Sequence, residues 1–519
     1  MTRPVGALQI RLRDAATSSL PAFLAIARTI ADEARRGRLG PGARLPGSRE
    51  LAVALGVHRN TVMAAYRELA AEGFLTSERG RGTFIARTLP EVKAKRWLSG
   101  VAIRANLAQR PHFAFEAPAH HASFIPNPET GFALYGGVPD TRLLPREALA
   151  RAYRRALRNE PHLLDYGDPR GDPRLRAALS EMLRTKRGLP VRADDIVVTR
   201  GSQMALALIG RVLARPGDVI AVEALGYQPA WRAFAHSPGV RLAPVPVDAD
   251  GLVVDALANL CEREAIRAVY VTPHHQYPTA VTMSAARRMA LLDLARSRRF
   301  AIVEDDYDHE FHYEGRPVLP LASGDDFGGV IYVGTLSKVL APGLRAGYLV
   351  APTAVRDAVL ALRFDIDRQG DRVGERALAE LMEDGELQRH FWRMRRVYRA
   401  RRDHCVRELR ERLGQWIDVS IPSGGMALWA RVSQRLPVSD FHAEASRRGV
   451  FFQPGRIFTW GQSETQHLRL GYGAFAEREL STALARLAEA ARAVALPSRS
   501  AQPSVARARA VAQSQGNGC

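Results

Sequence analysis

Cysteine is nearly absent from this chain of 519 residues. The three cysteines, Cys261, Cys405 and Cys519, lie far apart, and no two of them form a C-x-x-C pair. A disulfide framework and a cysteine-based zinc site both need suitably spaced cysteines, so neither is predicted. We predict no metal site elsewhere either. This usage is typical of proteins that work in a reducing cytosol.

Long apolar runs are also missing. No stretch reaches the roughly 18 consecutive apolar residues from which a membrane-spanning helix is predicted. The N-terminus carries Arg3, Arg11, Arg13 and Asp14, and no apolar signal segment follows them. We therefore expect a cytoplasmic protein that neither spans a membrane nor is secreted.

Acidic residues are scarce relative to basic ones. The chain has 54 Asp and Glu against 74 Lys and Arg, which gives a net charge of +20. Residues 1–100 alone hold 17 basic and 8 acidic residues. A basic surface attracts polyanions, of which nucleic acid is the commonest, whereas an overall arginine-rich composition is the alternative explanation. The local excess favours nucleic acid, and the length favours two or three domains.

The N-terminal 87 residues predict three helices and a hairpin. Residues 21–36 place apolar side chains at helical spacing. Ser48 precedes a short helix predicted over 49–55, and a second runs over about 59–72, with Gly56 between them. Residues 74–86 then alternate around a basic, glycine-rich tip, as a two-stranded hairpin does. Together these elements predict a winged helix-turn-helix domain over residues 1–87.

The rest of the chain predicts a different class of fold. Residues 88–130 are irregular and are expected to form a linker, and residues 497–519 a disordered basic tail. Between them, apolar runs of four to six residues alternate with helical patterns, which predicts an α/β domain over 131–496 with a mostly parallel sheet. The runs lie at residues 196–199, 219–223, 268–272, 301–304 and 330–334.

The string LPGSRELAVALGVHRNTVMAAYRELAAEGFL, followed by GRGTFI, resembles the winged helix-turn-helix of GntR-type bacterial regulators. The resemblance implies that the second helix enters the DNA major groove by its first turn. Polar and basic side chains there would contact base edges or phosphates, and those of the wing would hold phosphate or the minor groove. The residues implied to bind DNA are Arg49, His58, Arg59, Asn60, Thr61, Arg79, Gly80 and Arg81.

A second motif is GTLSKVLAPGLRAGY, residues 334–348. It resembles the lysine segment of fold-type I enzymes that use pyridoxal 5'-phosphate (PLP). The resemblance implies that Lys338 forms the internal aldimine, for which a neutral amine is required. It further implies that Arg345 and Ser337 bind the cofactor phosphate.

The acidic string VEDDYDHEF, residues 303–311, follows an apolar strand, where α/β proteins place ligand groups. By resemblance to the same enzymes, Asp305 pairs with the pyridine nitrogen and Tyr307 donates to the phenolic oxygen of the ring. The choice of Asp305 over Asp306 depends on the family pattern alone. A carboxylate metal cluster is the alternative interpretation of so many acids.

Four further segments resemble the family's pocket. In TRGSQMAL a strand turns into a helix, so backbone N–H groups with Ser202 and Gln203 would cradle a phosphate. In EALGY, Tyr227 would stack on the pyridine ring, although Leu225 replaces the usual proline. The segment TPHHQYPTA, residues 272–280, carries Ala280 where glycine is usual. In HLRLGYG, Arg469 would bind the substrate carboxylate as a bidentate pair.

Taken together, the chain resembles the MocR/GabR-type subgroup of GntR-like regulators. The resemblance implies a PLP-dependent transferase fold with a smaller C-terminal α+β subdomain, a homodimer, and a DNA operator of two half-sites. It implies a transcription regulator that senses an amino acid or a related amine through aldimine chemistry at Lys338. A working aminotransferase with an attached DNA-binding module is the alternative function, and a DNA-binding protein with an empty pocket is a third.

Overall fold

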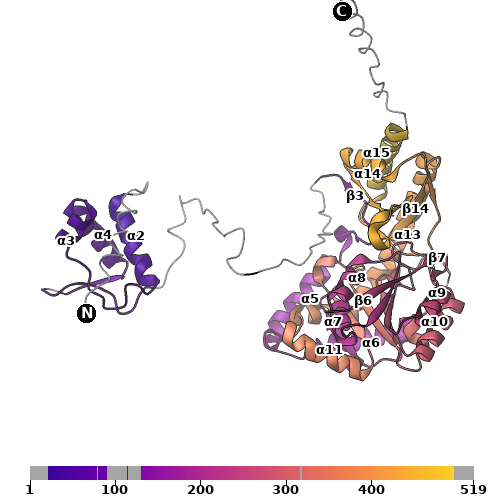
Figure 1. The fold of residues 1–519 in the computed structure, drawn as a ribbon, viewed down its shortest axis with the longest axis horizontal. Coiled ribbons are helices and arrows are strands. Elements are labelled where there is room, and N and C mark those ends of the chain that lie inside the picture. Colours follow the sequence, from indigo (N-terminus) through magenta and orange to yellow (C-terminus); the bar gives the residue numbers. More distant parts are fainter. Residues whose placement is uncertain (1–20, 79, 91–113, 115–129, 316–317, 496–519) are drawn as a thin grey trace, which may run out of the picture. The chain divides into compact units, whose positions relative to one another are not determined.

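The computed structural model describes residues 21–78, 80–90, 114, 130–315 and 318–495. Its contacts divide the chain into two compact units, Met1–Ala122 and Ser123–Cys519 (Figure 1). The predicted linker over 88–130 and the predicted tail lie almost entirely outside the described residues. Within those residues, no helix has both the length and the apolar character needed to cross a bilayer.

The first unit has the predicted three helices and hairpin. The helices are α2 (Ala22–Arg35), α3 (Ser48–Leu55) and α4 (Arg59–Ala71), and β1 (Leu75–Glu78) pairs antiparallel with β2 (Gly82–Ile85). One detail of the prediction was wrong, because Ser48 is the first residue of α3 and Gly47 occupies the N-cap. Fully buried apolar side chains from all three helices form one core, which holds α4 against its neighbours. They include Ile26, Ile30, Leu51, Val62 and Leu69.

The second unit is built on a seven-stranded sheet of order β4-β12-β11-β10-β9-β5-β6. All its neighbouring strands run parallel except β12, which is antiparallel to both neighbours. The mostly parallel sheet predicted from the apolar runs is therefore confirmed. The strands are β4 (Ile196–Thr199), β5 (Val219–Glu223), β6 (Arg241–Val245), β9 (Ile266–Val271), β10 (Ala301–Asp306), β11 (Val330–Thr335) and β12 (Gly347–Val350).

Helices cover both faces of this sheet (Figure 1). Successive residues of a strand point to opposite faces, so Tyr270 and Val303 pack into one core, whereas Val269 and Ile302 pack into another. This two-sided burial explains why the strands are continuous apolar runs. The helices around the sheet are α5 (Arg146–Asn159), α6 (Pro173–Arg187), α7 (Ser202–Leu213), α8 (Gln228–Ala235), α9 (Val254–Cys261), α10 (Ala285–Arg298), α11 (Thr353–Ile366) and α12 (Arg372–Glu383).

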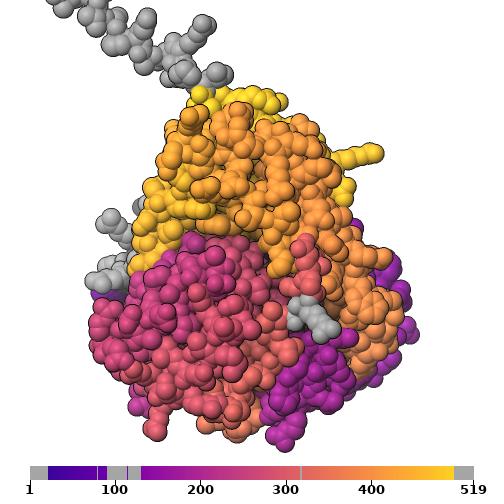
Figure 2. Space-filling view, turned by 90° about the vertical axis from the view of Figure 1, so that its right-hand side faces the viewer, coloured from indigo at the N-terminus to yellow at the C-terminus, as the bar shows by residue number. Residues whose placement is uncertain are grey.

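A smaller α+β subdomain follows, as predicted. The long helix α13 (Glu386–Leu413) leads into an antiparallel sheet of order β13-β14-β17-β16, which is covered by α14 (Val438–Arg447) and α15 (Glu477–Ala495). Figure 2 shows this subdomain, in orange and yellow, stacked on the part that holds the large sheet. Its strands are β13 (Ile417–Val419), β14 (Ala427–Val432), β16 (Gln453–Pro454) and β17 (His467–Gly471).

Several short elements complete the second unit. Strand β3 (Phe132–Ala133) pairs in parallel with β15 (Val450–Phe451), so the start of the second unit lies against its C-terminal part. A small hairpin joins β7 (Val247–Asp248) and β8 (Gly251–Leu252). The short 3-10 helices are η2 (Thr141–Leu143), η3 (Pro161–Leu164), η4 (Ala193–Asp195), η5 (His309–Phe311), η6 (Leu321–Gly324), η7 (Pro342–Leu344), η8 (Gly455–Phe458) and η9 (Trp460–Gln462).

Candidate functional site

A buried pocket lies at the carboxyl ends of the parallel strands. Thr272 follows β9, Asp305 lies at the end of β10, and Lys338 follows β11 by three residues. The carboxyl edge of an open α/β sheet is where such folds bind ligands. The residues that line the pocket are Gly136, Gly137, Ser202, Tyr227, Tyr270, Thr272, Tyr277, Asp305, Tyr307 and Lys338.

Lys338 projects its amine into this pocket. Burial, with Arg469 as a nearby cation, lowers the pKa of the Lys338 amine below its usual range. Gly137 lies beside it, since a Cβ at that position would be 3.5 Å from Nζ. The lowered pKa increases the fraction of Lys338 that is neutral and able to attack a carbonyl carbon.

Asp305 and Asp306, adjacent in sequence, occupy different environments. Tyr270 donates its hydroxyl to Oδ2 of Asp305 at 2.9 Å, while Oδ1 has no partner among the described residues. Burial raises the pKa of Asp305 to about 7. Asp306 instead accepts a hydrogen bond from Tyr332 at 2.6 Å and pairs with the buried Arg187 at 3.7 Å. Each carboxylate has an Oδ1 without a partner among the described residues, but only Asp305 is among the residues that line the pocket.

The turn before α7 forms one end of the pocket. Gly201 is the N-cap of α7 with a φ of +80°, a conformation that favours glycine. A Cβ there would lie 2.8 Å from Nη2 of Arg345, which donates to the carbonyl of Arg200 at 2.9 Å. Ser202, the first residue of α7, lines the pocket. Arg345 thus lies against the turn that presents the N-terminus of α7.

Ser337 and Gln203, the other residues predicted to bind the phosphate, differ in their hydrogen bonding. The hydroxyl of Ser337 is buried and has no partner among the described residues. Gln203 directs its amide nitrogen to the carbonyl of Pro229 at 2.8 Å, and its Oε1 is unpartnered. Neither residue is among those that line the pocket. Ser337 nevertheless has a free hydroxyl beside Lys338, whereas the amide group of Gln203 is held by α8.

Three tyrosines pack edge to face around the pocket. The ring centroids of Tyr227 and Tyr277 are 5.0 Å apart, and those of Tyr277 and Tyr307 are 6.0 Å apart. Burial raises the pKa of Tyr227 and Tyr307 above the usual range, so both hydroxyls keep their protons. The predicted residues Tyr227 and Tyr307 are therefore donors on the pocket wall.

Arg469 lies on β17, next to the pocket tyrosines. Its guanidinium carbon is 4.0 Å from the ring centroid of Tyr277 and its side chain is only 3% exposed. Among the described residues, Nε and Nη1 have no hydrogen-bond partner. Gly136 makes room for it, because a Cβ there would be 2.5 Å from the guanidinium carbon. A buried cation without a counterion is suited to bind a carboxylate.

Sequence reasoning missed five of the lining residues: Gly136, Gly137, Tyr270, Thr272 and Tyr277. The Gly136-Gly137 pair is the signal in the sequence that could have revealed this segment, because adjacent glycines let other side chains approach the backbone closely. Tyr270 lies within an apolar run, so the sequence predicts a core residue of a strand. Its contact with Asp305 comes from the neighbouring strand, so no local pattern reveals it.

The residues predicted to contact DNA lie in the first unit, at the start of α3 and α4 and at the hairpin tip. Arg49, His58, Arg59 and Asn60 are exposed, and Thr61 is half-buried. Nδ1 of His58 caps α4 by accepting from the backbone of Asn60 at 3.2 Å.

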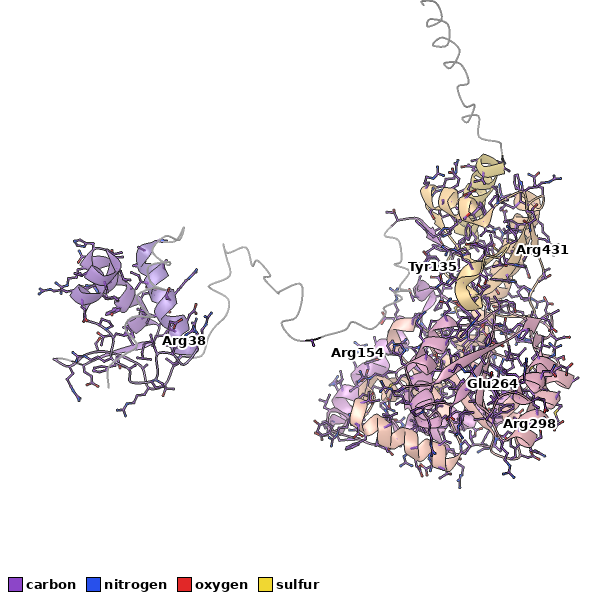
Figure 3. All side chains as sticks on the ribbon, viewed as in Figure 1. Arg38, Tyr135, Arg154, Glu264, Arg298 and Arg431 are labelled. Atoms are coloured by element: carbon purple, nitrogen blue, oxygen red, sulfur yellow. The ribbon has the colours of Figure 1, made fainter. Side chains whose placement is uncertain are left out.

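The hairpin tip is partly neutralised. Gly80 and Arg81 are exposed, and Arg81 pairs with Glu78 at 2.9 Å, while Arg79 lies outside the described residues. Basic side chains are not confined to this unit, since Arg154, Arg298 and Arg431 are exposed on the second (Figure 3). The prediction of a DNA surface therefore depends on the geometry of α3 and α4 more than on total charge.

Family models match both units. Residues 24–85 match the model described as bacterial regulatory proteins, gntR family, and residues 137–487 match the model described as aminotransferase class I and II. The two matched ranges correspond to the helix-turn-helix unit and to the domain that contains the pocket.

The chain is similar to named regulators and to a solved aminotransferase structure. The chain is 34% identical over 419 residues to a probable rhizopine catabolism regulatory protein MocR of Rhizobium meliloti, covering 80% of this chain and 83% of that one. It is 32% identical to the HTH-type transcriptional regulator TauR of Rhodobacter capsulatus, covering 94% and 97%. Among solved structures, the α-aminoadipate aminotransferase LysN of Thermus thermophilus, complexed with N-(5'-phosphopyridoxyl)-L-leucine, matches with a TM-score of 0.66 and 29% identity over 70% of this chain and 92% of that one.

Proposed function

The chain belongs to the MocR/GabR-type subgroup of GntR-like transcription regulators, and we propose that its aminotransferase-like domain binds PLP at Lys338 and senses an amino acid or a related amine. The observation that carries the proposal is the pocket itself. It joins a lysine of lowered pKa to a carboxylate with an unpartnered oxygen, and beside it lies a buried arginine with two nitrogens that have no partner among the described residues.

The residues of the pocket fit PLP. The unpartnered Oδ1 of Asp305 can accept from a protonated pyridine nitrogen, and the Tyr270 hydroxyl holds the other oxygen. The N-terminus of α7, with Ser202 and Arg345 beside it, offers N–H, hydroxyl and guanidinium donors to a phosphate. Ser337 would add its free hydroxyl, Gln203 would add its backbone N–H in the first turn of α7, and Tyr227 would stack on the ring. When bound, PLP supplies a carbonyl carbon for amines and an electron-withdrawing ring.

Recognition of the effector would depend on Arg469 and Lys338. The free Nε and Nη1 of Arg469 match the two oxygens of a carboxylate in a bidentate pair. Lys338, whose pKa is lowered by burial, can in its neutral form take up a proton from an incoming ammonium group, and Tyr307 can donate its hydroxyl proton in a hydrogen bond to the cofactor's phenolic oxygen. The carboxylate and the amine of the effector would thus be bound at two ends of one pocket, and an amino acid carries both groups.

The first unit would read DNA through the N-terminal turn of α4. Arg59, Asn60 and Thr61 lie on that turn, Arg49 lies at the start of α3, and His58 caps α4. The exposed groups can contact bases, and the tip residues Arg79, Gly80 and Arg81 can contact the backbone. Since operators are read where the chromosome lies, we place the protein in the cytoplasm.

We further propose a homodimer that binds two half-sites. An exposed apolar patch supports it: Tyr166 is 77% exposed and Phe364 is 51% exposed, and Arg368 lies over both rings at 4.2 and 4.9 Å. Apolar groups gathered in this way mark a contact surface, and two-fold symmetry is the commonest way to bury one.

The test of cofactor binding uses the full-length chain and Lys338→Ala. After incubation with PLP and desalting, the wild type should retain about one PLP per chain with visible absorbance, and the variant should lose most of it. DNA affinity without effector should stay within about twofold, which shows that the variant is folded. Equal PLP retention by the two proteins would contradict the proposed role of Lys338.

A working aminotransferase is the second candidate, because Lys338, Asp305 and Arg469 also suit turnover. Incubation with a panel of amino acids and a keto-acid acceptor separates the two. Sustained product formation at about 1 per second or faster is typical of enzymes. Such a rate would favour the aminotransferase, whereas DNA affinity that changes with one amino acid would favour the sensor.

A further inference from the structure

Four buried histidines gather next to the cofactor pocket, and neither proposed function uses them. His274 and His275 follow β9, and His309 and His312 lie in and just after η5. The ring centroids of His274 are 4.5 Å from His275, 4.4 Å from His309 and 5.7 Å from His312. All four side chains are at most 7% exposed.

Half of their eight ring nitrogens are buried without a partner among the described residues. Both nitrogens of His274, Nε2 of His275 and Nδ1 of His312 lack hydrogen-bond partners. A buried polar atom without a partner costs free energy, on the order of 1–3 kcal/mol each. Several such atoms in one place indicate that something absent from the polypeptide satisfies them.

His275 is already arranged as a metal ligand. Its Nδ1 lies 2.7 Å from Oδ1 of Asp308, so the carboxylate fixes the proton on Nδ1 and leaves the Nε2 lone pair free. Metal-bound histidines usually have such a carboxylate behind them. Gly424 leaves room in front of Nε2, because a Cβ at that position would be only 2.2 Å away.

We propose that His274, His275 and His312 bind one divalent transition-metal ion that prefers imidazole, with Zn²⁺ as the representative. One ligand atom from each lies within 4.8 Å of the others. A tetrahedral site with metal–nitrogen distances of about 2.0–2.1 Å needs nitrogens roughly 3.3 Å apart, so small side-chain rotations would complete it.

A second set, His274, Asp306 and His309, meets the same distance limit but is less suitable. Oδ2 of Asp306 is occupied, since it accepts from Tyr332 at 2.6 Å, pairs with Arg187 and lies 2.9 Å from Nδ1 of His309, so the two side chains satisfy each other without an ion. Both sets need His274, so we assign one ion to the all-histidine set. The bound ion would fix the loop that carries Tyr277 and, through Asp308, the segment of Asp305 and Tyr307.

The test measures metal binding by the untagged full-length protein after treatment with EDTA and dialysis. Zn²⁺ titration against a chromogenic chelator should give one site per chain with micromolar or tighter affinity, and Co²⁺ should give the intense visible absorption of a tetrahedral site. His274→Gln and His312→Gln should each weaken binding at least tenfold. His309→Gln, from the rejected set, and His236→Gln, on the exposed end of α8, should bind as the wild type does.

Three outcomes would overturn the site. The first is wild-type protein that shows no stoichiometric Zn²⁺ binding and no tetrahedral Co²⁺ spectrum, a result that needs no variant. The second is unchanged affinity in both His274→Gln and His312→Gln. The third is a greater loss of Zn²⁺ affinity in His309→Gln than in His312→Gln, which would reject this ligand set. Circular dichroism and thermal melting of each variant separate lost ligands from lost folding.

Discussion

At the scale of single residues, Asp305 shows how one carboxylate can be prepared for a ligand at the expense of its own solvation. Tyr270 satisfies one oxygen, and the other has no partner among the described residues. A pyridinium N–H would satisfy it with a charge-assisted hydrogen bond. Asp305→Asn should therefore reduce PLP affinity about tenfold or more, a change worth roughly 1.4 kcal/mol.

The control for this prediction is Asp306→Asn. Asp306 contacts Tyr332 and Arg187 and does not line the pocket, so its loss breaks a buried ion pair. We expect it to lower stability by about 3–5 kcal/mol. PLP titration and urea unfolding of both variants measure the contrast, and equal loss of PLP affinity in the two would argue against a special role for Asp305.

The raised pKa of Asp305 also predicts a dependence of stability on pH. Its pKa is about 7 in the fold and 3.8 in the unfolded chain, so the folded protein binds more protons between these values. The shift in pKa therefore does not change the free energy of unfolding below about pH 3.8, and it lowers that free energy increasingly as the pH rises to about 7. Without PLP, Asp305→Asn should thus be more stable than the wild type at pH 8, and this difference in stability should be smaller at pH 5. Thermal melts of the two cofactor-free proteins at both pH values test this.

Ala280 carries backbone strain where the sequence resemblance leads one to expect glycine. Its φ is +60°, in the left-handed region, and the turn is closed by hydrogen bonds between Gln276 and both Ala280 and Val281. Alanine in this region costs about 1 kcal/mol relative to glycine. Ala280→Gly should stabilise the protein by up to about 1 kcal/mol in urea unfolding, whereas Ala295→Gly, within α10, should destabilise it. Destabilisation by both changes would show that the Ala280 methyl contributes more by packing.

At the scale of elements, α4 concentrates the groups that would read DNA. Arg59 lies at its first position and makes one hydrogen bond at 3.3 Å to Ser48, so it is free to rearrange on DNA. Arg59→Ala should weaken binding to the specific operator by about 1–3 kcal/mol if Arg59 contacts a base. Arg81→Ala, in the wing, should weaken specific and non-specific DNA alike, with a smaller salt dependence. Fluorescence anisotropy with both DNAs at several salt concentrations distinguishes base contact from phosphate contact.

Local patterns predicted the elements well because burial on both faces leaves a clear signature. β4 and β5 coincide with the apolar runs at 196–199 and 219–223, β9, β10 and β11 differ from their runs by one or two residues, and β6 and β12 correspond to none of the predicted runs. The position of β12, antiparallel between β4 and β11, depends on pairing between distant segments and could not be read from sequence. The same holds for Gly136 and Arg469, which meet although they lie far apart in the chain.

At the scale of the whole molecule, a regulator needs its ligand pocket to influence its DNA surface. An effector can do so only by binding two states of the protein with different affinity, and the coupling is typically 1–3 kcal/mol, or about 5- to 150-fold. The coupling is reciprocal. DNA must change the affinity for the effector by the same factor as the effector changes the affinity for DNA.

This reciprocity gives a prediction for Arg469. An amino acid that shifts operator affinity should itself bind with affinity changed by the same factor when operator DNA is saturating. Arg469→Gln should remove both shifts, because the carboxylate loses its bidentate partner. Arg431→Gln, an exposed arginine on the neighbouring strand β14, should remove neither. Anisotropy measures the DNA arm and calorimetry the amino-acid arm. An effector response that survives in Arg469→Gln would show that the ligand is recognised elsewhere, since no arginine is among the residues that line the pocket.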